Sequence, residues 1–113
     1  MRILFDHCVP RASFREFADL PSDHASRLGW DHLSNGALLS AAEKAGFTVL
    51  VTIDQGIPAQ QSFRGRQISV LIIRANPMNI AAIRRGVKEI YTALGSLSPG
   101  EVKSLTIEPA PGP

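Results

Sequence analysis

Two aspartates stand directly after the two clearest apolar runs of the chain. Asp6 follows Ile3–Phe5, and Asp54 follows residues 47–53, a β-branched and uncharged run. If these runs are neighbouring parallel strands, both carboxylates lie at the sheet edge where open α/β proteins bind ligands. Two close carboxylates share a proton or hold a cation, and Mg²⁺ and Mn²⁺ prefer such oxygen ligands. We therefore predict that Asp6 and Asp54 bind one of these metals.

Each of these residues also has an ordinary structural role that stays open. An aspartate after a strand often forms a turn or caps a helix. Asn35 offers a carbonyl oxygen near the predicted metal site, but it could equally cap a helix that ends at Lys44. Glu43 is about two helical turns further along and is too distant to join them.

The apolar pattern predicts buried strands that alternate with helices. Strands are expected at residues 3–5, 47–53, 68–73 and 102–107, with a weak one at 24–26; helices are expected at 10–19, 34–44, 59–63 and 79–94. Continuous apolar strands separated by helices are typical of a parallel sheet covered on both faces. The predicted fold class is therefore α/β with a central, mainly parallel sheet.

Composition indicates one domain, which we place at residues 1–108, with residues 109–113 as a flexible tail. The chain has 113 residues, of which 44% are apolar. A single cysteine excludes an internal disulfide and favours the cytoplasm. No apolar run approaches the roughly 20 residues that cross a bilayer, so we expect no membrane partner.

The arginines are candidates for contacts with nucleic acid. The net charge of +2 indicates little, but nine of the twelve cations are arginine, which suits phosphate. Arg64 and Arg66 follow the segment after Asp54, and Arg74 ends the strand at 68–73. We predict phosphate contacts for these three and for Gln60, which could alternatively cap its own helix.

Three stretches carry a resemblance to a known family: ILFDHCVP at 3–10, SNGALLSAAEKAGFTVLVTIDQGIP at 34–58, and the QQS that follows at 60–62. They resemble the short PIN-like proteins, a bacterial domain-of-unknown-function family related to VapC-type toxins. The resemblance extends from Met1 to about Ile107. It implies a three-layer α/β/α sandwich and a Mg²⁺-dependent ribonuclease that cleaves single-stranded RNA. It also implies an antitoxin protein or a second copy of the chain as partner.

The resemblance assigns the first family carboxylate to Asp6 and the central-strand carboxylate to Asp54. Relatives carry further acids where this chain has His7, Asn35-Gly36-Ala37 and Gly56. A second hypothesis is therefore a catalytically impaired PIN-like protein that binds RNA or a partner protein.

A third hypothesis is a phospho-accepting receiver domain, which also has an Asp-x-x-x-Pro segment after a central strand. Such a domain needs Ser or Thr and then Lys at its later strand ends. This chain has Arg74-Ala75 and Glu108-Pro109 there, which argues against it.

Overall fold

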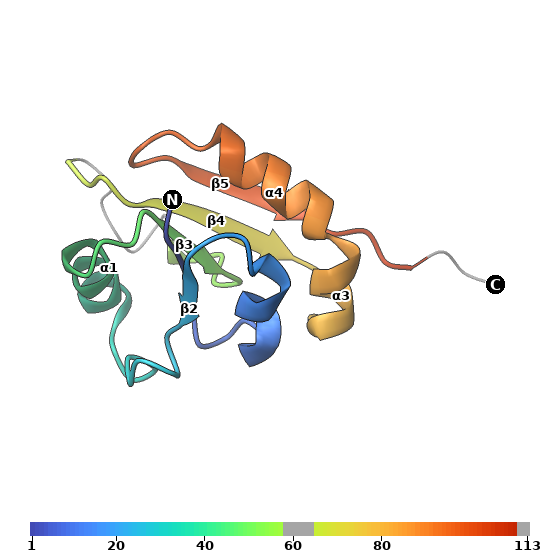
Figure 1. Ribbon diagram of the computed structural model, residues 1–113, viewed down its shortest axis with the longest axis horizontal. Coiled ribbons are helices and arrows are strands. Elements are labelled where there is room, and N and C mark those ends of the chain that lie inside the picture. The colour runs from blue at the N-terminus through green and yellow to red at the C-terminus, as the bar shows by residue number, and fades with distance from the viewer. Residues whose placement is uncertain (58–64, 111–113) are drawn as a thin grey trace.

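The computed structural model describes residues 1–57 and 65–110, and it contains one five-stranded parallel sheet. The strand order is β2-β1-β3-β4-β5 (Figure 1). The strands are β1 (Ile3–Phe5), β2 (Ser22–His24), β3 (Val49–Thr52), β4 (Ser69–Arg74) and β5 (Val102–Thr106). All four neighbouring pairs are parallel. The prediction of an α/β fold with a mainly parallel sheet is confirmed.

β1 and β3 are direct neighbours, and this pairing places the predicted site. Phe5 lies opposite Val51 in the parallel register. Asp6 and Asp54, which follow these strands, therefore share the carboxyl edge of the sheet. The chain runs from β1 outward to β2, then crosses back to β3 and continues the other way to β4. Open α/β sheets bind ligands at the carboxyl edge where the strand order reverses in this way.

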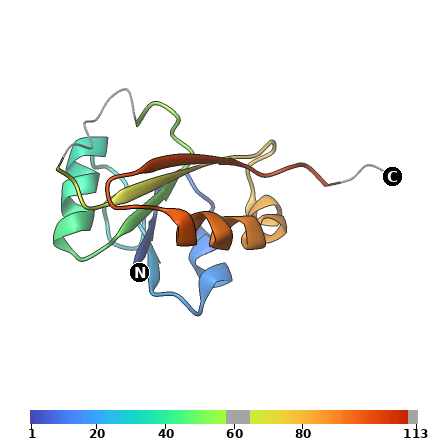
Figure 2. The ribbon, with the colours of Figure 1, turned by 90° about the horizontal axis from the view of Figure 1, so that it is seen from above.

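Four helices lie in the described residues and pack against the sheet: the 3₁₀ helix η1 (Arg11–Phe17), α1 (Asn35–Lys44), α3 (Ile80–Arg85) and α4 (Val87–Ser96). Successive side chains of a strand point to opposite faces. Accordingly, Phe5 packs in one cluster with residues of η1, α3 and α4, whereas Leu4 packs in another with residues of α1. Figure 2 shows α1 apart from α3 and α4. None of these helices is long and apolar enough to cross a bilayer.

The predicted single helix at 79–94 is wrong, because the structure divides it at Gly86. Gly86 ends α3 and begins α4. A Cβ atom built on Gly86 would lie 2.7 Å from Cδ1 of Ile107, which is almost fully buried. The residue after β5 therefore occupies the space that a side chain at position 86 would need.

Two other predicted elements differ in type or position, and one lies outside the described residues. The helix expected at 10–19 is the shorter 3₁₀ helix η1. The weak strand expected at 24–26 forms two residues earlier, because pairing with β1 joins Phe5 to His24. The helix expected at 59–63 lies outside the described residues.

Candidate functional site at the carboxyl edge of the sheet

Thr52 connects the two aspartates. It is the last residue of β3 and is fully buried. Its Oγ1 donates a hydrogen bond of 2.7 Å to Oδ2 of Asp6 and accepts one of 3.1 Å from the backbone N–H of Asp54. Asp6 is itself only 2% exposed. One buried hydroxyl therefore fixes the orientation of Asp6 relative to the chain at Asp54.

The other oxygen of Asp6 faces His7. Oδ1 accepts the backbone N–H of His7 at 2.8 Å and lies 3.1 Å from its Nδ1. A carboxylate offers about four acceptor positions, of which these contacts and Thr52 use three. The His7 side chain is 53% exposed. Oδ1 of the buried carboxylate is therefore in contact with a half-exposed imidazole ring.

Asp54 is held by the turn that follows it and by helix α1. Its Oδ1 accepts the backbone N–H of Gly56 at 2.9 Å, and its Oδ2 accepts Nδ2–H of Asn35 at 3.0 Å. Ser34, and not Asn35, caps α1, since its Oγ accepts the N–H of Ala37. The Asn35 amide thus belongs to the site, where its uncharged group avoids repulsion of Asp54.

Two carboxylates, those of Asp6 and Asp54, are the acidic groups of this network. Within residues 1–57 and 65–110, no three His, Cys, Asp or Glu side chains are grouped closely enough to hold a metal. The oxygens available are the carboxylates of Asp6 and Asp54, with the Asn35 amide beside them. Mg²⁺ is commonly held by one or two carboxylates together with waters and substrate phosphates. The set does not fit zinc, whose protein sites supply three or four ligands.

Cys8 lies beside this network. Its Sγ is 3.6 Å from Oγ1 of Thr52. Burial raises the pKa of the Cys8 thiol above its ordinary value, and the negative charge of Asp6 raises it further. A thiol needs to ionise to act as a nucleophile or a metal ligand. The raised pKa therefore disfavours the thiolate that either role needs.

Arg74 is the predicted phosphate contact that the structure places at this edge. It ends β4 and lines a cavity of about 370 Å³ together with Gln55, Asn76 and Thr106. Isoleucines, Ala75 and Met78 form the apolar part of the lining. The cavity therefore offers polar groups on an apolar wall, next to the turn that holds Asp54.

The other predicted contacts are not brought to this edge. Arg66 forms an ion pair with Glu43 and precedes β4, so it lies at the amino edge of the sheet. Glu43 also accepts the backbone N–H of Gln67 at 3.1 Å. Gln60 and Arg64 lie outside the described residues. Among the described candidates for phosphate contact, Arg74 alone accompanies the aspartates.

The prediction missed two residues that organise the edge. Thr52 is one, and its signal is a hydroxyl in the β-branched run at 47–53, two residues before Asp54. His24 is the other: it is buried, its Nδ1 accepts the N–H of Ser26 at 3.1 Å, and its Nε2 lies 2.8 Å from the carbonyl oxygen of Val9. Because Nδ1 is an acceptor, Nε2 carries the proton and donates to Val9. No local pattern around His24 indicates these contacts.

Comparisons of the chain with protein-family models, with curated proteins and with solved structures found no match.

Proposed function

We propose that this protein is a PIN-like ribonuclease that uses Mg²⁺ or Mn²⁺ to hydrolyse phosphodiesters of single-stranded RNA. The observation that supports it is the placement of Asp6 and Asp54. They follow adjacent parallel strands, at the reversal of strand order, and Thr52 joins them by two hydrogen bonds. An α/β sheet that gathers two carboxylates at this point has the ligands for a hard cation where ligands bind.

Within this proposal, the chain's own residues hold the carboxylates in place. Thr52 orients Asp6, and Asn35 and Gly56 orient Asp54. When bound, the metal activates a water and offsets negative charge on the phosphodiester. Arg74 is exposed at the same edge, and its guanidinium suits a phosphate oxygen.

The decisive experiment is RNA cleavage by Asp6→Asn and Asp54→Asn in the presence of Mg²⁺ or Mn²⁺. Each variant should lose at least about 100-fold in rate, since metal-ion catalysis contributes several kcal/mol. Asp31→Asn is the matched control, because Asp31 is an exposed acid outside the network. Circular dichroism checks that each variant folds. Equal cleavage by wild type and both site variants would refute the mechanism.

A second candidate function is RNA or protein binding without catalysis. The observation that favours it is the engagement of Asp6, whose carboxylate already has three close contacts. Isothermal titration calorimetry separates the two functions. A protein that binds RNA but takes up neither Mg²⁺ nor Mn²⁺ at millimolar concentrations is a binding protein.

The remaining parts of the proposal follow from the resemblance to the PIN-like proteins and, for the location, from the single cysteine. They are a three-layer α/β/α arrangement of PIN type, a cytoplasmic location, and an antitoxin or a second copy of the chain as partner. Co-purification of the untagged protein from its own cells, followed by mass spectrometry, identifies which partner it has.

A further inference from the structure

Three arginines surround a second cavity, apart from the one that Arg74 lines. This cavity has a volume of about 510 Å³, and its lining residues are Arg11, Ala12, Phe14, Arg15 and Arg27. The guanidinium carbon of Arg27 lies 4.6 Å from the centre of the Phe14 ring, and that of Arg15 lies 5.5 Å from it. Among the described residues, none that lines the cavity is a carboxylate. We call these residues the arginine pocket.

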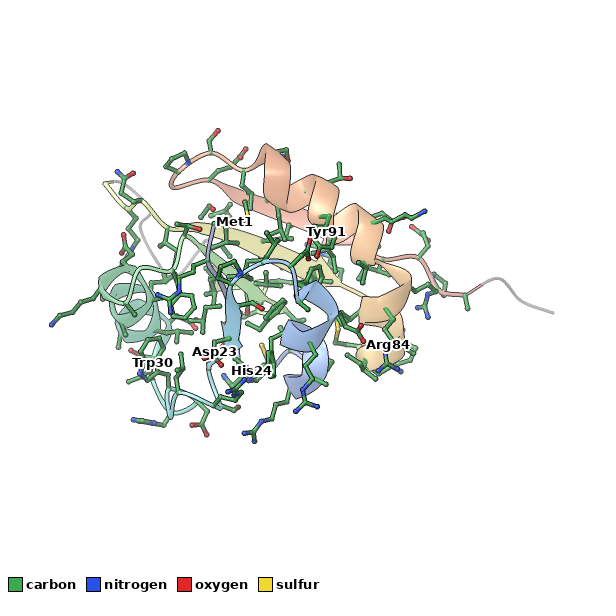
Figure 3. The ribbon with its side chains drawn as sticks, viewed as in Figure 1. Met1, Asp23, His24, Trp30, Arg84 and Tyr91 are labelled. Carbon is green, nitrogen blue, oxygen red and sulfur yellow. The ribbon has the colours of Figure 1, made fainter. Side chains whose placement is uncertain are left out.

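Two acids near the arginine pocket bind residues of α3 and α4 and not the pocket arginines. Glu16 forms an ion pair with Arg84 of α3, and Asp19 accepts a hydrogen bond from Tyr91 of α4. Figure 3 labels Arg84 and Tyr91 on these helices. The acids of η1 and the residues after it thus bind the helices on one side. Arg11 and Arg15 of η1 line the arginine pocket instead.

Charge compensation inside the arginine pocket is incomplete. Asp23 lies 3.6 Å from Arg27, and the same oxygen also accepts the backbone N–H of His24. In the part of the chain that the structure describes, Arg11 and Arg15 have no ion pair with a carboxylate. Three guanidiniums around one cavity with one acid beside them produce a positive potential that attracts an anion.

The arginine pocket lies at the same sheet edge as Asp6. His24 ends β2, and its ring donates to Val9 in the loop that leads from Asp6 to η1. The N–H of Arg27 donates to the carbonyl of His24 at 2.9 Å. Asp23 and His24 lie together near η1 in Figure 3. The pocket therefore stands on the β2 side of Asp6, whereas Arg74 stands on the β4 side.

We propose that the arginine pocket binds backbone phosphates of a polynucleotide chain. Arginine binds phosphate through paired N–H donors, and phosphate contacts supply most of the sequence-independent affinity for nucleic acid. A chain with repeating charges can contact the arginine pocket and Arg74 at once, and a free phosphate can contact only one of them. Between the arginine pocket and Arg74 the polynucleotide passes Asp6 and Asp54. Only this passage along the aspartates rests on the proposed function.

The test is binding of a fluorescent single-stranded RNA of about 12 nucleotides, followed by anisotropy without divalent metal. Arg11→Gln/Arg15→Gln should weaken binding by about tenfold or more, because each arginine makes charge-assisted contacts. Its plot of log affinity against log salt should flatten by about 0.7 per lost phosphate contact. Arg27→Gln should act in the same direction. Lys44→Gln/Lys88→Gln is the matched control, because it removes two exposed charges elsewhere.

Each other outcome overturns the proposal. It fails if wild type and Arg11→Gln/Arg15→Gln bind the RNA equally, or if wild type does not bind it at low salt. It also fails if inorganic phosphate or polyglutamate competes as well as the RNA does. Because this assay contains no metal, absence of metal-dependent cleavage by the wild-type protein would contradict the proposed function and leave the binding result unaffected.

Discussion

The hydroxyl of Thr52 donates a hydrogen bond of 2.7 Å to the carboxylate of Asp6, across 46 positions of the chain. Both residues are buried, at 0% and 2% exposure. A buried carboxylate that loses a donor keeps its desolvation cost without the compensating bond. This contact therefore ties the stability of the fold to the geometry of the candidate site.

Removing the hydroxyl of Thr52 should destabilise the protein, because the hydrogen bond to Asp6 is lost. We expect Thr52→Val to lower the free energy of unfolding by about 1.5–3 kcal/mol, because Asp6 is charged and buried. Thr52→Ser keeps the hydroxyl and should retain most of the stability. Urea denaturation followed by circular dichroism measures both. Wild-type stability in Thr52→Val would show that Asp6 does not depend on this bond.

Ser13 provides the opposite case of a fully buried hydroxyl. Its Oγ has no hydrogen-bond partner in the described part of the chain. Ser13→Ala removes a polar atom that gains nothing from its position, so stability should stay within about 1 kcal/mol or rise. The same urea series compares it directly with Thr52→Val. A larger loss in Ser13→Ala than in Thr52→Val would reverse the assignment of the two hydroxyls.

Cys8 should report on the charge at Asp6. Because burial and Asp6 raise the thiol pKa, alkylation by iodoacetamide at pH 7 should be slower than for a free thiol. Asp6→Asn removes one cause and should shift the pH–rate profile to lower pH, though burial keeps the pKa raised. A metal bound at Asp6 should accelerate alkylation in wild type and not in Asp6→Asn.

The same shift sets the sign of a pH effect on stability. Because the pKa of Cys8 is raised in the folded state, the stability that this thiol contributes to the fold is fully present below its unfolded pKa of about 8.5. It is lost as pH rises through the folded pKa. Comparing urea unfolding of wild type and Cys8→Ser on both sides of pH 8.5 measures it. A contribution that grows with alkaline pH would contradict the direction.

Asn35→Asp should add the third carboxylate that the PIN-like pattern has near this position. The new acid would face Oδ2 of Asp54, which Asn35 contacts at 3.0 Å. Like charges at this range repel, so the metal-free variant should unfold at a lower temperature. Mg²⁺ should then stabilise Asn35→Asp more than wild type, because the affinity for the cation rises with the number of carboxylates.

Asn79→Asp is the control for that substitution. Asn79 caps α3 through its Oδ1, which accepts the N–H of Ala82 at 2.9 Å, and aspartate can keep this bond. Thermal unfolding with and without Mg²⁺ compares the two variants. An Asn35→Asp protein that responds to Mg²⁺ no more than Asn79→Asp does would place the metal, if any, elsewhere.

Gly86→Ala should destabilise the junction of α3 and α4. Its Cβ would lie 2.7 Å from Ile107 Cδ1, so the buried Ile107 or the helix pair must shift. Overpacking of this kind costs about 1–3 kcal/mol. Gly95→Ala, in α4 with no atom within 4 Å of the added Cβ, should instead stabilise by up to about 1 kcal/mol. Urea unfolding that ranks the two variants in the reverse order would contradict this packing.

The strands and helices that could be predicted from the sequence are those marked by a pattern of neighbouring residues. The apolar runs that end at Asp6 and Asp54 predicted β1 and β3 as buried parallel strands, and the spacing before Lys44 predicted α1. These predictions succeed because the spacing of apolar residues within a short stretch indicates a buried strand or an amphipathic helix. If β1 and β3 are neighbouring parallel strands, both aspartates lie at the carboxyl edge of the sheet.

Which residues contact one another in the site and in the core follows from the three-dimensional fold. Thr52 donates a hydrogen bond to Asp6, and Ile107 packs against Gly86. The Asn35 side chain donates to Asp54, and Ser34 caps the helix. The fold also separates the cations, pairing Arg66 with Glu43 and leaving Arg74 at the edge. Such contacts join positions far apart in the chain, so no local pattern contains them. They depend on strand order and helix placement, which the packing of the whole core selects.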